Sequence, residues 1–177
     1  MDYRVGDPVM HWMYGLGEVI KIEERVLAEK TNLYYAIQVR DLTIWVPAND
    51  QATVRLRRPV PAKEFEKCLP LLSAPGDPLP DDRQERKLQI QARLKDGLVE
   101  SLCRVIRDLH AYQAQIRPLN DNDQALLKRS QNILLGEWVH ALAVTPAQAE
   151  AELRRRLAEI PAGPRPRQEG KRSHVPG

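Results

Sequence analysis

The sequence of 177 residues lacks the features that mark membrane, secreted and metal-binding proteins. No run of residues approaches the roughly 18 apolar side chains that a membrane span needs. The first residues have no apolar segment of the kind found in secretory signals. Its two cysteines, Cys68 and Cys103, belong to no CxxC motif, which argues against a structural zinc site or a disulfide framework. We therefore expect a cytoplasmic protein without a membrane partner, built as one domain or two small ones.

Motifs for catalysis and cofactor binding are also missing. There is no HExxH, no Walker loop and no GxGxxG, and the four histidines lie far apart in the sequence. Cys103 follows the apolar flank of a predicted helix, where a buried and inert thiol is more common than a nucleophile. The sequence thus predicts a protein that is not an enzyme and that needs no cofactor and no metal.

The net charge of +3 is unevenly distributed along the chain. Residues 1–60 and residues 61–160 each hold equal numbers of acidic and basic side chains, so the excess belongs to residues 161–177. That segment is rich in Pro, Gly and Arg and poor in large apolar groups, which predicts a disordered basic tail. Between Arg83 and Arg129, 10 basic and 6 acidic side chains give a local excess of +4.

The first 60 residues carry the pattern of short β-strands. Apolar and polar residues alternate over residues 7–12, 18–26, 33–39, 42–46 and 54–57, and we expect turns at residues 15–17, 30–32 and 47–50. Five short strands with short turns predict a small antiparallel β-barrel of the SH3 or Tudor type.

After residue 60 the apolar period becomes helical. A short helix at residues 61–69 and a Pro-rich linker lead to residue 80, and a compact all-α domain of four to five helices is expected over residues 81–160. We expect helices at residues 83–94 and 98–109, one beginning near Asn120, and one that starts at Thr145-Pro146. The predicted buried side chains include Leu88, Ala92, Leu94, Leu98, Leu102, Val105, Ile106, Leu109 and Trp138.

An ordered set of short motifs accompanies these patterns. It comprises Val5-Gly6-Asp7-x-Val9, Gly15-x-Gly17, Ile22-Glu23, Tyr34-Tyr35, Leu42-x-Ile44-x-Val46-Pro47 and Val54-x-Leu56-Arg57. The set resembles the RNA polymerase-interacting domain of the CarD/CdnL family of bacterial transcription regulators, a domain shared with the transcription-repair coupling factor. The resemblance continues through Leu72-Ser73-Ala74-Pro75, Val105-Ile106-Arg107-Asp108-Leu109 and residues 131–137, which match the helical C-terminal domain of that family.

The resemblance implies that the barrel, residues 1–60, binds the polymerase β subunit by pairing with an edge strand. Arg25 matches a basic position of that interface, and the second such position is Trp45. Because Trp45 alternates with Ile44, its ring is expected either at the polymerase interface or in the groove between the two domains. The expected polymerase-binding residues are Arg25, Trp45, Val46 and Pro47.

The resemblance also implies that the helical domain contacts promoter DNA weakly and modulates the stability of the open complex. Family members carry a tryptophan that wedges into the minor groove, and the matching position here is Arg83. The wedge is therefore absent, or Arg83 replaces it as a cation in a narrow groove. The expected DNA-binding residues are Arg83, Arg86, Lys87, Arg93, Lys128 and Arg129, and the family implies a monomer.

Two other functions stay open at the level of sequence. In one, the barrel binds polymerase while the helical domain recruits a protein, so that the chain is an adaptor. In the other, the barrel is an RNA-binding module, which its balanced charge disfavours because neutralised phosphates dominate nucleic-acid affinity.

Overall fold

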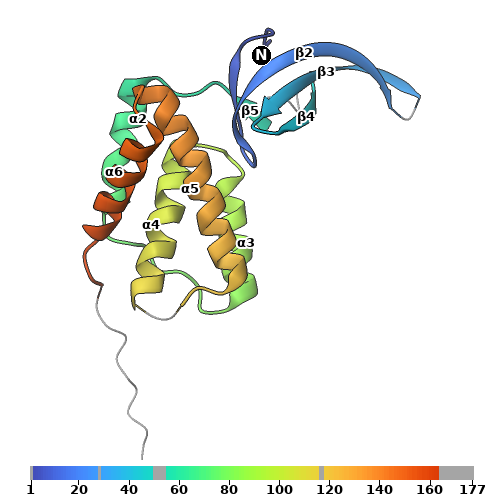
Figure 1. Ribbon diagram of the computed structural model, residues 1–177. Coiled ribbons are helices and arrows are strands. Elements are labelled where there is room, and N and C mark those ends of the chain that lie inside the picture. Colours follow the sequence, from blue (N-terminus) through green and yellow to red (C-terminus); the bar gives the residue numbers. More distant parts are fainter. Residues whose placement is uncertain (1, 28, 50–54, 116–117, 164–177) are drawn as a thin grey trace, which may run out of the picture.

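The structure, a computed structural model, describes residues 2–27, 29–49, 55–115 and 118–163. Over these residues a curved antiparallel sheet is followed by a bundle of helices that lies beside it (Figure 1). Each part has its own group of buried apolar side chains. The β-then-α architecture expected from the sequence is confirmed. The predicted disordered tail lies outside the described residues from residue 164 onward.

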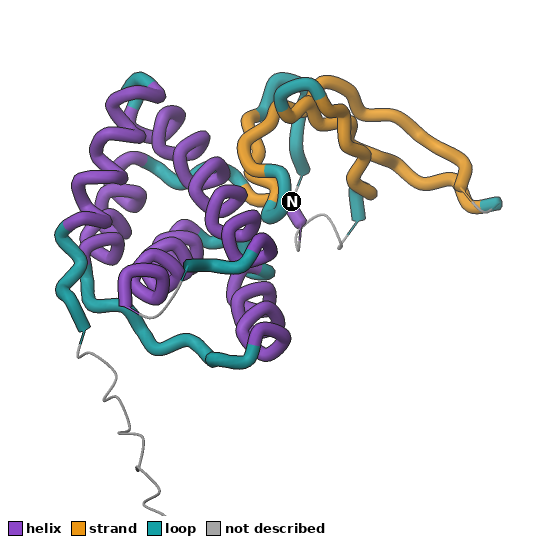
Figure 2. The backbone as a smooth tube through the Cα atoms, turned by 60° about the horizontal axis from the view of Figure 1, so that its bottom comes forward, coloured by secondary structure: helices purple, strands orange, loops and turns teal. Residues whose placement is uncertain are grey.

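Five strands form the sheet, all with antiparallel neighbours. They are β1 (Pro8–His11), β2 (Gly15–Leu27), β3 (Lys30–Val39), β4 (Leu42–Pro47) and β5 (Leu56–Arg57), in the spatial order β4-β3-β2-β1-β5. The long β2–β3 hairpin extends away from the helices in both views (Figures 1 and 2). Among the described residues, β4 and β5 are the two edges of this sheet, and each has one side that no described strand pairs with.

Alternation along the strands buries one face of the sheet. Val9, Val19, Ile37 and Val46 are almost fully buried in a cluster that the rings of Tyr3 and Tyr35 complete. The register pairs Tyr35 with Val46 and Ile37 with Ile44, which brings apolar side chains of neighbouring strands onto the same face. The same register places Trp45 and Pro47 on the opposite face.

Two turns differ from the sequence prediction. The first hairpin turns at residues 12–14, and Gly15 and Gly17 lie inside β2. Gly17 is needed for close packing, because a Cβ atom there would lie 2.7 Å from the carbonyl oxygen of Gln38. The residues predicted as the second turn, 30–32, belong to β3, and Glu29 precedes them with a φ of 62°. The hairpin is thus longer than the sequence pattern indicated.

The helical bundle begins with α2 (Ala62–Cys68) and the 3₁₀ helix η1 (Leu69–Ser73). Four longer helices follow: α3 (Arg83–Leu94), α4 (Val99–Gln115), α5 (Asp121–Leu142) and α6 (Pro146–Ala158). Side chains cap three of them, since Asp82, Asn120 and Thr145 each accept a hydrogen bond from a backbone N–H in the first turn. Among the described residues, no helix combines the length and apolarity needed to cross a membrane.

The core of the bundle draws on every one of these helices. Trp138, expected in the core, is 2 % exposed, and its ring lies 5.6 Å from that of Phe65. Phe65 belongs to α2, and the neighbouring Leu69, Leu72 and Leu79 are also buried in this core. The short helix expected at residues 61–69 is thus observed, and the segment 61–80 packs onto the bundle along much of its length.

The apolar face of α3 differs from the prediction. Leu88 is 57 % exposed and Ala92 is also exposed, whereas Ile90, Leu94 and the charged Arg86 are buried. On α4, Leu102, Val105, Ile106 and Leu109 are buried as expected, but Leu98 precedes the helix and is half exposed. On α3, Arg86 and its buried partners occupy the inner face, where an apolar residue was expected. The buried face of this helix therefore differs from the predicted one.

Candidate functional site

Strand β4 presents two different faces to its surroundings. Val46 is 2 % exposed within the sheet core and Ile44 packs against that core. Trp45 and Pro47 lie on the other face and are half-buried. The Val46 side chain points into the core and its backbone faces Tyr35 of β3, so a partner strand would pair with the alternate residues of β4, such as Thr43 and Trp45. Of the four predicted polymerase-binding residues, Val46 is thus enclosed by the sheet, whereas Trp45 and Pro47 lie on its other face.

Arg25 covers the ring of Trp45. Its guanidinium carbon lies 3.5 Å from the ring centroid, which is a close cation–π contact between β2 and β4. Arg25 Nε also donates to Oε1 of Glu23 at 3.1 Å, and Lys21 forms a second ion pair with Glu23. These two cations hold the pKa of the Glu23 carboxyl below its usual range. The side chain of Arg25 remains 43 % exposed, so this stacked pair, with Pro47, forms an accessible surface that we call the Arg25–Trp45 patch.

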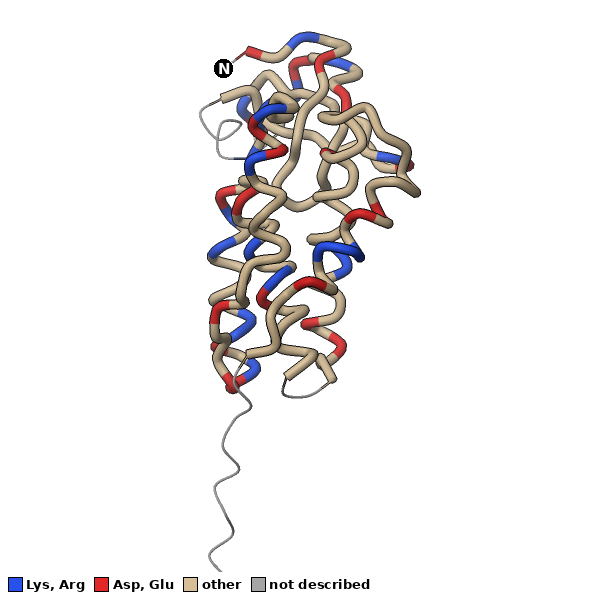
Figure 3. Tube along the Cα trace, turned by 90° about the vertical axis from the view of Figure 1, so that its left-hand side faces the viewer, with Lys and Arg blue, Asp and Glu red and all other residues tan. Residues whose placement is uncertain are grey.

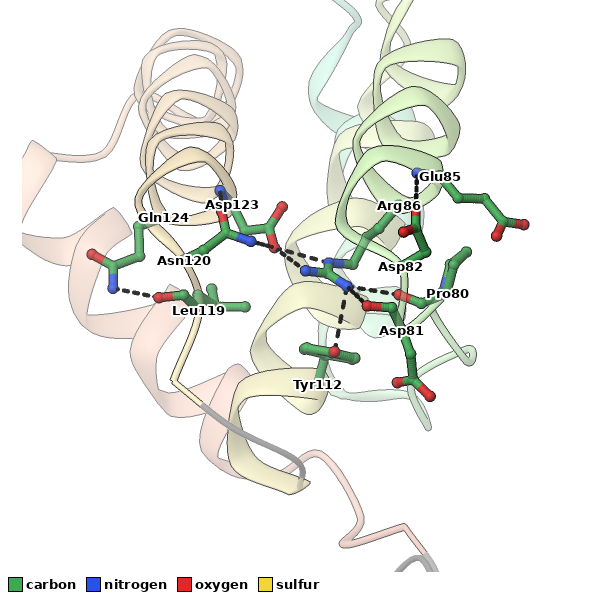
Figure 4. A network of polar contacts seen from close by, with 10 residues as sticks. All are labelled: Pro80, Asp81, Asp82, Glu85, Arg86, Tyr112, Leu119, Asn120, Asp123 and Gln124. Atoms are coloured by element: carbon green, nitrogen blue, oxygen red, sulfur yellow. Dashed lines mark hydrogen bonds and ion pairs between the residues drawn. The ribbon is translucent and has the colours of Figure 1, made fainter.

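Arg86 lies inside the helical bundle and is 3 % exposed (Figure 4). Its Nε and Nη2 donate to Oδ2 of Asp123 at 2.8 and 2.7 Å, and Nη1 donates to the carbonyl oxygens of Pro80 and Asp81. The guanidinium also lies over the ring of Tyr112. A side chain with this many buried partners joins the start of α3 to the start of α5. Arg86 therefore stabilises the bundle instead of facing DNA.

Arg93 is also engaged by a buried carboxylate. Its Nη1 donates to Oδ2 of Asp108 at 2.9 Å, and about a third of the side chain is exposed. Arg107 holds the other oxygen of Asp108 and extends to Asp77. This network ties the segment before α3 to α4. Several of the ten cations between Arg83 and Arg129 are thus paired with carboxylates within the bundle.

Four of the predicted DNA-binding residues have no ion pair among the described side chains. Arg83 and Lys87 stand one turn apart on α3, and Lys128 and Arg129 are adjacent on α5. The second pair lines a groove that faces the sheet, so its surroundings differ from those of the α3 pair. Basic and acidic positions are interspersed along the helices (Figure 3). These four residues thus form two small cationic pairs on different helices, not one continuous basic face.

A buried ion pair fixes the sheet against the bundle. Two nitrogens of Arg57, on β5, donate to the two carboxylate oxygens of Glu137 at 2.6 Å each. Glu137 is fully buried in α5 and also accepts from the backbone N–H of Val60. Arg57 Nε donates to the carbonyl oxygen of Gly97 as well. We call Arg57 and Glu137 the interdomain clamp, because they join β5 of the sheet to α5 of the bundle.

The clamp was not found from the sequence. Arg57 and Glu137 each fell within a family motif, but nothing in their spacing of 80 residues indicated a contact. The available signal was an acidic residue next to Trp138 on an apolar helix face, where a carboxylate needs a buried cation.

The described residues offer little for catalysis. No group of three or more His, Cys, Asp or Glu side chains in the described part of the chain could hold a metal ion. Cys103 is fully buried, and burial raises the pKa of its thiol far from the range of reactive cysteines. His11 is neutral near pH 7, because burial lowers its pKa to about 4. Its Nδ1 accepts hydrogen bonds from the backbone N–H groups of Met13 and Tyr14, so it shapes the first turn.

Comparison with known proteins gives matches to both parts of the fold. Residues 3–60 match a family model described as the CarD-like/TRCF RID domain, and residues 67–154 match one described as the CarD C-terminal domain. A similar chain from Bacillus subtilis (strain 168) bears the name "Putative transcription factor YdeB". It is 21 % identical over 152 residues, which cover 84 % of this chain and 98 % of the relative. The two models together extend over the sheet and most of the bundle.

Proposed function

The chain belongs to the CarD-like family of transcription regulators, and from this premise we propose that it attaches to RNA polymerase through its sheet and acts on promoter DNA through its helical bundle. The observation that carries the proposal is the presence of both family domains, in order, in one chain. The first of them is an RNA polymerase-interacting domain, which supports the polymerase as partner. We propose the β subunit as the site of attachment and a monomer as the active form.

The edge strand β4 supports this mode of attachment. An edge strand offers unpaired backbone N–H and C=O groups, and a partner strand that pairs with them gains affinity from main-chain hydrogen bonds. The Arg25–Trp45 patch lies on the outward face beside that edge and supplies an aromatic anchor and a cation. Such residues frequently dominate interface energetics. Backbone pairing along residues 42–47 and side-chain contacts at Arg25, Trp45 and Pro47 together form the proposed polymerase interface.

Arg83 and Lys87 are the proposed DNA contacts. Both follow the capping residue Asp82 at the start of α3, and neither has an ion-pair partner among the described side chains. Arg83 is exposed and occupies the family's wedge position, where its guanidinium can enter a minor groove narrowed at the edge of the bubble. Contacts of this kind would raise the cost of reannealing and so lengthen the life of the open complex.

Binding of the full chain to core polymerase tests the first half of the proposal. Arg25→Glu and Trp45→Ala are each expected to weaken binding by about tenfold or more, since both remove part of a central anchor. Arg154→Glu is a matched control, because Arg154 is an exposed arginine of α6 on the helical bundle. Equal affinity of all three variants and the wild type would exclude this interface.

Binding of the polymerase-attached protein to forked promoter DNA tests the second half. Arg83→Glu combined with Lys87→Glu is expected to reduce the protein-dependent gain in DNA affinity and to lower its salt dependence. Arg83→Trp restores the family's wedge and is expected to strengthen the effect. A gain in affinity that is insensitive to all these changes would place the DNA contact elsewhere.

A further inference from the structure

A groove runs between the sheet and helix α5. Its main hollow has a volume of about 600 Å³ and is lined by Tyr14, Leu42 and Arg40 from the sheet and by Lys128, Arg129 and Ile133 from α5, among others. A second hollow of about 380 Å³ adjoins it and shares Tyr14, Arg40 and Asn132 with the first. The shared lining makes the two hollows one elongated groove, which extends over Leu16 and Gly136 toward the start of α6.

Part of the groove wall is apolar and exposed. Leu42 is 56 % exposed and Tyr14 is 44 % exposed, while Ile133 forms buried wall between them. Single exposed apolar side chains are ordinary, but several around one concave surface are typical of a binding site. An occupant with at least one large apolar side chain would cover them.

Three cations surround this apolar wall. Arg40, Lys128 and Arg129 form no ion pair with any described side chain, and Asp41 is the one carboxylate in the lining of the main hollow. Other arginines of the bundle, such as Arg86 and Arg93, are paired with buried carboxylates. The second hollow adds one carboxylate, Glu150, so the groove as a whole holds three cations against two carboxylates and keeps an excess of positive charge.

Arg40, which lines the groove, has an unfavourable backbone conformation. Its φ is 52°, in the left-handed region that glycine adopts more easily, and Gln38 Nε2 donates to its carbonyl oxygen at 2.6 Å. A glycine would satisfy the β3–β4 turn at lower cost. An arginine at such a position indicates a use for the side chain beyond the turn.

We propose that this groove binds an acidic segment of a protein partner, in which carboxylates flank a large apolar side chain. The carboxylates would pair with Arg40, Lys128 and Arg129, and the apolar side chain would pack against Leu42 and Tyr14. The elongated shape favours an extended peptide over a compact small molecule. A DNA backbone could use the cations but would leave the apolar wall uncovered. The proposal does not depend on the contacts proposed for polymerase or promoter DNA.

Selection from a display library of random short peptides on the full-length protein tests the proposal. The peptides that bind are expected to combine Asp or Glu with Phe, Leu or Ile, and their affinity can be measured by fluorescence anisotropy. Arg40→Gly and Lys128→Glu should each weaken that binding by about tenfold. Arg40→Gly is the sharper variant, because it relieves the turn and should leave the protein at least as stable as the wild type.

Two controls separate the possible outcomes. Arg154→Glu, outside the groove, should leave peptide affinity unchanged, and Arg83→Glu should reduce the DNA effect without altering peptide binding. The proposal is overturned if selection yields no acidic and apolar consensus, or if the selected peptides bind Arg40→Gly and Lys128→Glu as tightly as the wild type. It is equally overturned if those two variants lose affinity for duplex DNA while peptide binding is unchanged.

Discussion

Arg86 shows how burial decides the role of a charged residue. The same guanidinium could serve a phosphate or a buried carboxylate, but its partners Asp123 and the carbonyls of Pro80 and Asp81 enclose it. We predict that Arg86→Ala lowers the free energy of unfolding by about 3–5 kcal/mol, because it leaves the Asp123 charge buried and unpaired. Arg83→Ala, one turn earlier on α3, should change it by no more than about 0.5 kcal/mol. Urea unfolding of both variants measures the difference.

The opposite result would show that Arg86 contacts DNA. In that case Arg86→Ala would be as stable as the wild type but would lose its effect on promoter DNA, whereas Arg83→Ala would keep it.

His11 makes stability depend on pH in the weakly acidic range. Burial, with a smaller contribution from Arg55, lowers its pKa to about 4 from the ordinary value of 6.5. As the pH falls below 6.5, the unfolded chain takes up a proton that the folded protein resists, so stability present above that pH is lost toward pH 4. We predict that the wild type loses about 1–2 kcal/mol more than His11→Asn between pH 7 and pH 5.

The variant keeps an acceptor for the N–H groups of Met13 and Tyr14 but has no titrating group. Unfolding at a series of pH values compares the two proteins, and the comparison cancels the contribution of His110, whose pKa burial also lowers. Parallel pH profiles for the two proteins would contradict the assignment to His11.

The burial of a single residue could be predicted where its apolar character and its position on a helix face were enough to determine it. Trp138 and Cys103 lie on apolar helix faces and are buried as expected. Arg86 and Glu137 were not predictable, because sequence spacing shows neither the carboxylate that a buried arginine will meet nor the arginine that a buried glutamate needs. Contacts between residues far apart in the chain decide such cases.

At the scale of elements, two glycines differ in whether the surrounding structure leaves space for a side chain. Gly17 lies in β2 with no room for a Cβ, whereas a Cβ at Gly136 in α5 would make only an ordinary contact of 3.8 Å with Leu16. We predict that Gly17→Ala destabilises the sheet by about 1–3 kcal/mol through overpacking. Gly136→Ala should stabilise the protein by about 0.5–1 kcal/mol, because it favours the helix.

Thermal unfolding of the two variants checks both signs in one experiment. Destabilisation by both substitutions would show that Gly136 also needs the space, and that the sheet packs more closely on α5 than its contacts with Leu16 indicate.

The order and type of the elements could be read from the sequence, but some of their ends could not. The period-2 and helical patterns located five strands and the main helices, and the caps at Asn120 and Thr145 fixed two helix starts. The glycines at 15 and 17 were mistaken for a turn, since glycine also marks close packing within strands. The apolar character of Leu88 predicts a buried position, but the inner face of α3 is occupied by Arg86 and Leu88 is exposed.

At the scale of the whole molecule, the interdomain clamp joins the sheet to the helical bundle. We predict that Arg57→Ala costs about 3–5 kcal/mol, because it leaves Glu137 buried with few donors. Hydrogen exchange should also become faster in the turn before Gly15, which packs against Ile133 of α5.

The neighbouring Arg58→Ala is the control. Arg58 forms an exposed ion pair with Asp7, and such pairs contribute at most about 1 kcal/mol. Equal stability of the two variants would show that the clamp does not join the domains energetically.

The distribution of charge across the molecule also changed its meaning once the fold was known. The local excess between Arg83 and Arg129 suggested one DNA-binding face, yet Arg86, Arg93, Arg104 and Arg107 are all paired within the bundle. Of the predicted DNA-binding residues, those without an ion pair among the described side chains fall into the α3 pair and the groove around Lys128. The sequence shows how many charged residues a segment contains. Ion pairs between distant segments determine which of these residues remain available to a binding partner.

The lifetime of the polymerase–promoter open complex tests the central claim most directly. Lifetime is measured by challenge with a competitor, with the wild type and with each variant at the same concentration. We predict that the wild type lengthens it and that Arg25→Glu requires about tenfold more protein for the same effect. Arg83→Glu with Lys87→Glu should lose the effect even when bound to polymerase. An unchanged lifetime with the wild type, or a full effect from all variants, would contradict the account.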